Sequence, residues 1–247
     1  MGFGPEEVER YARHIVLREI GGPGQQRLKA ARILIVGAGG LGAPAALYLA
    51  AAGVGVIGLV DPDVIALSNL QRQVLYATDE VGELKVDKAS DRLQALNPHV
   101  EVEAHAVTVT ADNALDVISG YDMVLDGTDN FPVRFAVSDA CVTAGKPLVS
   151  GAIGRWTGQV GVFAPGGPCY RCLVPETPPD AETCSAVGVV GALAGVIGSM
   201  MALEAIKLAT GAGQPLAGRL MIYDALAAEA RTVGLSKDPA CPACGGT

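Results

Sequence analysis

The feature that most constrains this chain is a glycine-rich turn that directly follows a short β-branched run. Residues 33–36 form that run, residues 37–42 form the turn, and residues 44–52 are apolar and typical of a helix. A G-x-G-x-x-G motif between a strand and a helix binds phosphate, because glycine lets backbone N–H groups approach it and the helix dipole adds positive charge. Gly37, Gly39 and Gly42 satisfy the motif, and Gly40 in the same turn is a further candidate for contact with the ligand.

A second run of apolar residues, 55–60, ends at Asp61. An acidic residue roughly 20 positions after the glycine turn is where dinucleotide-binding proteins bind ribose hydroxyls. We therefore predict a nucleotide at this turn. The motif alone favours NAD.

The later segments alternate between helix and strand patterns. Helices are expected over residues 83–96, 112–119 and 130–144, and strands over 100–105, 123–126 and 147–150. Short connections between such elements predict parallel strands with right-handed crossovers. Beyond residue 150 the pattern favours antiparallel strands at 156–163, 219–223 and 228–233. The predicted fold class is therefore α/β: a Rossmann-like doubly wound mixed sheet, parallel in its N-terminal part and antiparallel in its C-terminal part, with an N-terminal helical arm.

We interpret residues 1–247 as a single domain, because the sheet pattern is continuous and half of the residues are hydrophobic, enough for a sizeable core. Residues 1–30 form the expected arm, with an amphipathic helix over 5–17, a break at 21–24 and a short helix over 25–30. Residues 31–165 form the nucleotide-binding half. Residues 166–247 are expected to hold a cysteine-rich knuckle, a crossover loop, a long buried helix and the last strands.

Charge and hydropathy exclude several classes of protein. The net charge of −8 argues against a nucleic-acid partner, which requires a basic surface. Charged residues near the N-terminus leave no apolar segment for a signal peptide, so a cytoplasmic location is expected. Residues 186–203 carry no charge and are long enough to flag a membrane span. Their many Gly, Ala and Ser residues favour close helix packing instead, so we expect a core or subunit-contact helix and no membrane.

Charged side chains near the expected nucleotide edge favour a triphosphate over a dinucleotide. Asn69, Arg72 and Lys85 follow the strand that ends in Asp61, and Asp129 follows the strand at 123–126. A dehydrogenase has no evident use for two more cations and an amide beside its cofactor, whereas a triphosphate needs cations. Asp129 is expected either to hold Mg²⁺ or to order the site. The alternative is that Arg72 and Lys85 are ordinary surface residues.

Four of the six cysteines form two Cys-x-x-Cys pairs, and this spacing favours a structural Cys₄ zinc site in a reducing compartment. One pair could instead be redox-active, but neither begins a helix near the first strand. The predicted metal ligands are Cys169, Cys172, Cys241 and Cys244. Cys141 lies on an apolar helix face and is expected in the core. Cys184 lies in a Pro-rich crossover loop, and a lone cysteine there is interpreted as an incidental thiol.

Several of these segments, in the same order, resemble the motifs of the MoeB/ThiF (HesA/MoeB/ThiF) family, the bacterial relatives of ubiquitin-activating enzymes. The resemblance extends through both cysteine pairs and covers nearly the whole chain. The segments that carry it are residues 37–42 (GAGGLG), 61–63 (DPD), 68–73 (SNLQRQ), 82–85 (GELK) and 126–130 (DGTDN).

The resemblance implies an ATP-dependent adenylyltransferase. In this family the C-terminal glycine carboxylate of a ubiquitin-like sulfur carrier, MoaD-like or ThiS-like, attacks the α-phosphate of ATP and releases pyrophosphate. By similarity Asp61 would bind the ribose, and Asp129 would act with Mg²⁺. The residues implied to contact the triphosphate are Asn69, Arg72 and Lys85.

The resemblance also implies a homodimer, in which Arg13 reaches into the partner's site. Cys184 matches a cysteine that takes part in sulfur transfer in the thiamine branch, so it is either part of a sulfur relay or an incidental thiol. No rhodanese-like domain follows Cys244, so sulfur is expected to come from elsewhere. The sequence contains no motif that identifies the carrier, which could serve molybdopterin synthesis, thiamine synthesis, tRNA thiolation or several of these. Two other interpretations stay open: an NAD-dependent oxidoreductase, and a catalytically idle nucleotide-binding scaffold dimer.

Overall fold

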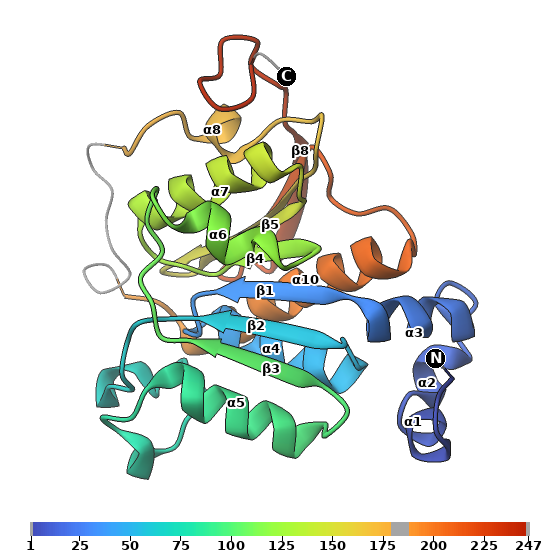
Figure 1. Cartoon of the computed structure of the whole chain (residues 1–247). Coiled ribbons are helices and arrows are strands. Elements are labelled where there is room, and N and C mark those ends of the chain that lie inside the picture. The colour runs from blue at the N-terminus through green and yellow to red at the C-terminus, as the bar shows by residue number, and fades with distance from the viewer. Residues whose placement is uncertain (1, 179–187, 246–247) are drawn as a thin grey trace.

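The computed structural model describes residues 2–178 and 188–245. Within them the strands form an eight-stranded mixed sheet in the order β3-β2-β1-β4-β5-β6-β7-β8 (Figure 1). The strands are β1 Arg32–Val36, β2 Val56–Val60, β3 Glu101–His105, β4 Met123–Asp126, β5 Leu148–Gly154, β6 Thr157–Phe163, β7 Arg219–Asp224 and β8 Glu229–Gly234. The helices are α1 Pro5–Arg10, α2 Ala12–Ile15, α3 Gly21–Ala30, α4 Gly42–Ala52, α5 Lys85–Leu96, α6 Ala114–Ser119, α7 Phe131–Ala144, α8 Tyr170–Leu173 and α10 Gly191–Thr210, with short 3₁₀ turns η1 Leu67–Asn69 and η2 Thr78–Glu80.

Strands β1 to β5 form the parallel half of the sheet, and β1 lies at its centre. It pairs in parallel with β2 on one side and β4 on the other, and β3 and β5 extend the two flanks. Strands β5, β6, β7 and β8 then pair antiparallel. The predicted fold class is confirmed. Since the parallel strands point the same way, the turns after β1, β2 and β4 meet at one edge (Figure 1).

Helices cover both faces of the sheet, and each face has its own core. On one face Leu28, Leu49 and Leu93 of α3, α4 and α5 pack with α10 against alternate residues of β1 such as Ile33. On the other face the remaining β1 residues, including Leu34, pack against α6 and α7. A strand with both faces covered is apolar throughout. This explains the continuous apolar run that precedes the glycine turn.

The N-terminal arm differs in detail from the prediction. The helix expected over 5–17 is divided at Tyr11 into α1 and α2, and α3 begins at Gly21 instead of after the glycines. Pro23 fits there because the first turn of a helix has no partner for its N–H. Tyr11 is buried, its hydroxyl accepts a 2.8 Å bond from Asn97, and a Cβ on Gly53 would meet its ring at 2.4 Å. Tyr11 therefore anchors the arm beside α4.

Helix α10 packs on the same face of the sheet as α3, α4 and α5. It ends at Thr210, further along the chain than expected. It is long and apolar enough, by length and composition alone, to cross a membrane, with a mean hydropathy of 1.6. Leu193, Ile197 and Met201 are nonetheless buried in the core. A Cβ on Gly198 would approach the Leu41 carbonyl oxygen to 2.4 Å, which shows how closely α10 packs on α4. Its other face is open, with Leu203 60% exposed.

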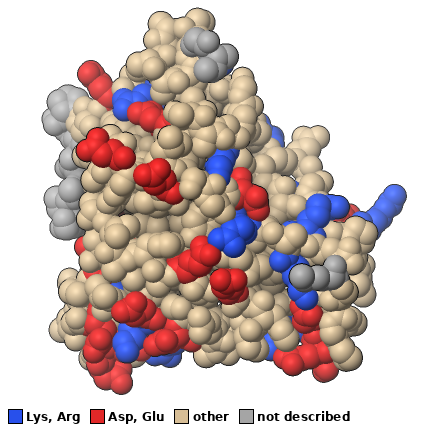
Figure 2. Space-filling model, in the orientation of Figure 1, with Lys and Arg blue, Asp and Glu red and all other residues tan. Residues whose placement is uncertain are grey.

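Charged side chains are distributed over the surface without a dominant basic patch on the face in view. Figure 2 shows acidic and basic side chains interspersed there. Several charges are paired, including Arg171 with Asp139 at 2.8 Å and Arg92 with Glu80 at 2.9 Å. This face carries no concentration of positive charge of the kind that attracts phosphate backbones.

Candidate nucleotide and metal sites

A cavity of about 390 Å³ opens at the carboxyl ends of β1, β2 and β4. Its position follows the rule that ligands of open α/β sheets bind outside the carboxyl ends of the strands, where the strand order reverses. Three glycines of the turn line it, and so do most of the charged residues that the sequence singled out. The predicted residues at its wall are Gly37, Gly39, Gly40, Asp61, Arg72, Lys85 and Asp129.

The glycine turn is built so tightly that larger residues have no room. Gly37 has a positive φ of 91°, a conformation that L side chains rarely adopt. A Cβ on Gly42 would lie 1.8 Å from the Gly37 carbonyl oxygen. Gly42 therefore does not line the cavity; it closes the turn that does. Helix α4 begins there and directs its N-terminal end toward the cavity.

Asp61 and Lys85 form a buried pair at the cavity wall. The Asp61 carboxylate accepts the N–H of Ala38 at 2.8 Å and that of Asp63 at 2.9 Å. Lys85 Nζ lies 2.8 Å from Asp63 Oδ2 and 3.6 Å from Asp61 Oδ1. Only 5% of the Lys85 side chain is exposed, so its ammonium is fixed between the two carboxylates. The alternative of an ordinary surface residue is wrong for Lys85.

Burial raises the pKa of Asp61 more than the positive charge of Lys85 and the two backbone N–H bonds lower it. The desolvated carboxylate consequently favours a ligand that donates hydrogen bonds to it. Ribose hydroxyls are donors of that kind.

Arg72, Asn69 and Asp129 occupy more open positions. Arg72 is half-buried at the wall, and its guanidinium donates a 3.1 Å bond to the Ser68 carbonyl oxygen. Asp129 is exposed on the turn after β4. Asn69 does not line the cavity; its side-chain oxygen lies 3.4 Å from the N–H of Ala66, at the edge of hydrogen-bond distance, in the same turn. Its expected contact with a triphosphate stays a prediction.

Two buried polar residues at the cavity were missed by sequence reasoning. Arg134 lines it and is paired with Asp126 at 3.6 Å. Gln73 is 4% exposed, and its side-chain oxygen has no hydrogen-bond partner among the described residues. An arginine within the apolar α7 pattern was a signal that could have identified Arg134. Gln73 gave no such signal, because it lies inside a polar loop.

Arg13 and Cys184 are not placed at the cavity by the structure. Arg13 is exposed on α2, and no hydrogen bond or ion pair joins it to another residue in the described ranges. Its arm lies beside the amino ends of β1 to β3, whereas the cavity lies at the carboxyl ends of the strands (Figure 1). Cys184 lies outside the described residues.

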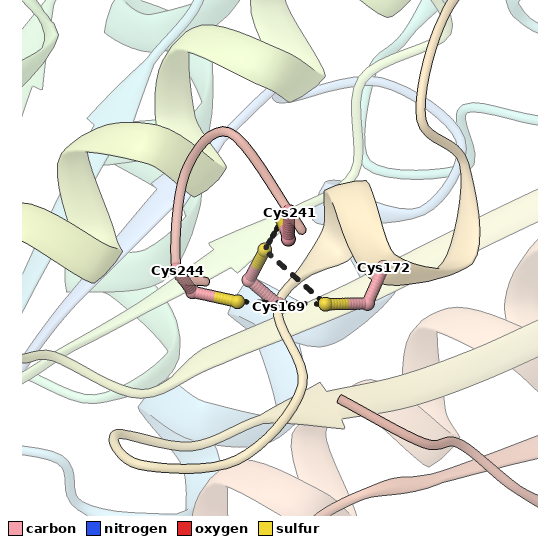
Figure 3. Close-up of side chains that lie close together, drawn as sticks. All are labelled: Cys169, Cys172, Cys241 and Cys244. Carbon is pink, nitrogen blue, oxygen red and sulfur yellow. Dashed lines mark hydrogen bonds between the residues drawn. The ribbon is translucent and has the colours of Figure 1, made fainter. Parts of the chain in front are cut away.

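The two cysteine pairs converge into one cluster. Figure 3 shows the sulfurs of Cys169 and Cys172, at α8, facing those of Cys241 and Cys244, from the C-terminal segment. All four sulfurs lie within 4.8 Å of one another, and individual separations are 3.9, 3.5 and 3.4 Å. Tetrahedral zinc with Zn–S bonds of 2.3 Å requires S···S separations of about 3.8 Å. The cluster therefore fits a tetrahedral Cys₄ metal site. Cys141 is buried in the core, as expected.

Comparison with known proteins decides the family. The model of the ThiF family matches residues 11–243, nearly the whole chain. The chain belongs to the ThiF family. It is 51% identical over 253 residues to the sulfur carrier protein adenylyltransferase of Thermus thermophilus, covering 99% of this chain and 93% of that one. It is 50% identical to the probable adenylyltransferase/sulfurtransferase MoeZ of Mycobacterium tuberculosis, covering 96% of this chain but only 62% of MoeZ.

Solved structures show the same fold. Escherichia coli MccB crystallised with a MccA variant superposes with a TM-score of 0.85 at 24% identity, over 96% of this chain and 74% of that one. PaaA superposes with a TM-score of 0.82 at 25% identity, over 96% and 76%. Another MccB structure, which contains ATP, has a TM-score of 0.81 and covers 90% of this chain and 69% of that one. These matches cover 90–96% of this chain, so most of its architecture is shared.

Proposed function

We propose that this ThiF-family chain is an ATP-dependent adenylyltransferase for a small ubiquitin-like sulfur-carrier protein. A carboxylate oxygen of the carrier's C-terminal glycine attacks the α-phosphorus of ATP. The bond between the α-phosphorus and the bridging oxygen breaks, and pyrophosphate leaves with its electron pair. The observation that carries the proposal is the pairing of two cationic side chains, Arg72 and Lys85, with the phosphate-binding glycine turn in one cavity. Two relatives about 50% identical to this chain are named as adenylyltransferases, which supports the proposal.

Each wall residue has a role that its position supports. Asp61, held by two backbone N–H groups, would accept the ribose hydroxyls. Arg72 and Lys85 would bind the phosphates, Arg72 as a fork and Lys85 as a point charge. Asp129 would hold Mg²⁺, which neutralises phosphate charge when bound. Positioning and charge neutralisation are sufficient to carry such a reaction, since no covalent bond to the protein is required.

The position of Arg13 supports a homodimer that supplies this residue across the interface. Arg13 cannot reach the cavity of its own chain, because it lies near the amino ends of the strands and the cavity is at their carboxyl ends. It also has no partner among the described side chains. Beside it Val16 is 76% and Leu17 45% exposed, and on α10 Leu203 is 60% exposed. Exposed apolar side chains of this kind mark interaction surfaces. The site would then be complete only in the dimer.

The Cys₄ cluster would hold structural Zn²⁺. The four thiolates would tie the C-terminal segment to α8, which packs against α7. Cys184 is not required for adenylation and stays a candidate for a later sulfur-transfer step.

The test is isotope exchange between labelled pyrophosphate and ATP. With Mg²⁺ and a carrier ending in Gly-Gly, exchange is expected; with a carrier lacking its last glycine, it is not. Absence of exchange with both MoaD-like and ThiS-like carriers would refute the proposal. Tight binding of NADH without binding of ATP would favour an oxidoreductase instead, and that outcome would leave Arg72 and Lys85 without a role.

A further inference from the structure

A buried arginine on α7 holds the turn that carries Asp129. Only 6% of the Arg134 side chain is exposed. Its guanidinium donates to the backbone oxygen of Thr128 and, at 2.8 Å, to that of Gly151. The Asp126 carboxylate, 3.6 Å from the guanidinium, accepts the Thr128 N–H at 3.0 Å and the Thr128 hydroxyl at 2.6 Å. Thr128, directly before Asp129, is therefore bound from both sides.

The residues between the first two cysteines hold this arginine and its helix. Tyr170 is 4% exposed, and the Arg134 guanidinium carbon lies 6.0 Å from the centre of its ring. The next residue, Arg171, bonds Asp139 of α7 at 2.8 Å and lies over the Phe135 ring at 4.3 Å. Two adjacent residues of the Cys-x-x-Cys loop thus fix α7 directly. A shift of residues 169–172 would therefore move Tyr170 relative to the Arg134 guanidinium.

We propose that Arg134 is a positioning residue for Asp129, and that Tyr170 couples its position to occupation of the Cys₄ cluster by a metal. The inference rests on the proposed function, because it assumes that Asp129 acts with Mg²⁺ and ATP. Coupling between two sites is reciprocal: if the metal at the cysteines favours Mg²⁺·ATP, Mg²⁺·ATP favours the metal by the same factor. The cysteine cluster then has a role in the nucleotide site besides holding the C-terminal segment.

The first test uses Arg134→Lys, which keeps the charge beside Asp126 but replaces the planar fork. The expected result is a rise of about tenfold in the Mg²⁺ concentration for half-maximal pyrophosphate exchange, with less than a twofold change in metal-free ATP binding by calorimetry. Arg32→Lys is the matched control, since Arg32 is paired with Glu103 at 2.7 Å and does not line the cavity. If Arg134→Lys does not fold, Thr128→Val is used instead, because it removes the hydrogen bond from the Thr128 hydroxyl to Asp126. The same rise in the Mg²⁺ midpoint is then expected. An unchanged Mg²⁺ midpoint in the folded variant overturns the role of Arg134.

The second test does not depend on activity. Zinc transfer from the loaded protein to a chromogenic chelator is measured with and without Mg²⁺ and a non-hydrolysable ATP analogue. The expected result is at least a fivefold increase in zinc affinity with the nucleotide, at the lower end of typical couplings, and loss of that increase in Tyr170→Leu. If calorimetry shows that the protein binds the analogue but its zinc affinity is the same with and without it, the coupling alone is overturned. A protein that binds no analogue overturns both the coupling and the proposed function.

Discussion

Replacing Lys85 by methionine tests whether the Lys85 ammonium stabilises the buried Asp61 carboxylate at the cavity wall. The substitution keeps the length of the side chain but removes an ammonium that lies 3.6 Å from Asp61 and 2.8 Å from Asp63. Asp63 is 65% exposed at its side chain and can be solvated, whereas only 8% of the Asp61 side chain is exposed. Removing one partner of a buried pair costs about 3–5 kcal/mol. Since Asp61 keeps two backbone N–H bonds, we expect the lower end, about 3 kcal/mol, which lowers Tm by about 6–12 °C.

The loss of stability should depend on pH in a defined direction. Burial already raises the pKa of Asp61, and without Lys85 that pKa rises further. A raised carboxyl pKa means that the folded state resists ionisation, so stability is lost as pH rises from the unfolded pKa to the folded one. The difference in Tm between Lys85→Met and wild type should therefore be small near pH 4 and reach its full value at neutral pH.

The assay is thermal unfolding over this pH range, followed by calorimetry with ATP and AMP. Lys88→Met, one turn from the start of the same helix, is the control and should change stability by less than about 0.5 kcal/mol. Asp61→Asn combined with Lys85→Met should recover most of the lost stability. The affinity for ATP should fall more than that for AMP. A Tm difference that does not vary with pH, or an equal loss for ATP and AMP, would refute the reasoning.

Three further predictions follow from the same geometry. Arg72→Met should lower kcat/KM for ATP about 10- to 100-fold, the value of a charge-assisted bond. Little change in Tm is expected, since within the described residues Arg72 bonds only the Ser68 carbonyl oxygen; unchanged exchange kinetics would contradict this. Gly42→Ala should abolish ATP binding by calorimetry because its Cβ would lie 1.8 Å from a carbonyl oxygen, whereas Gly120→Ala, with open space around it, should not. An equal mixture of Arg13→Ala and Asp129→Ala chains should regain about a quarter of wild-type exchange activity through mixed dimers, and no recovery would exclude a shared site.

The sequence was sufficient to predict the sheet and the edge where the cavity lies. Strand patterns such as residues 33–36 are apolar throughout because both faces of β1 are buried, and that signal is local. The glycine turn, Asp61 and Lys85 could be placed together because parallel strands bring their carboxyl ends to one edge. Boundaries are predicted less accurately: the sequence predicts a break at residues 21–24, whereas α3 begins at Gly21, because proline is tolerated in the first turn of a helix.

What the sequence did not reveal depends on contacts between distant segments. Arg134 was overlooked because its partners, Asp126 and Gly151, lie on two other strands and nothing in α7 indicates them. The spacing predicts the convergence of Cys172 with Cys244, but it does not predict the packing of Tyr170, between Cys169 and Cys172, against α7. Side-chain networks of this kind are set by tertiary packing and leave no periodic pattern.

The most direct test of the central claim is the mass of the carrier after incubation with the protein, ATP and Mg²⁺. If the cavity is built for a triphosphate and directs a carboxylate to its α-phosphorus, a carrier ending in Gly-Gly gains the mass of one AMP residue. With Arg72→Met or Asp129→Ala this gain should form at least about 10-fold more slowly. A carrier of unchanged mass, with a protein that binds NADH and not ATP, would contradict it.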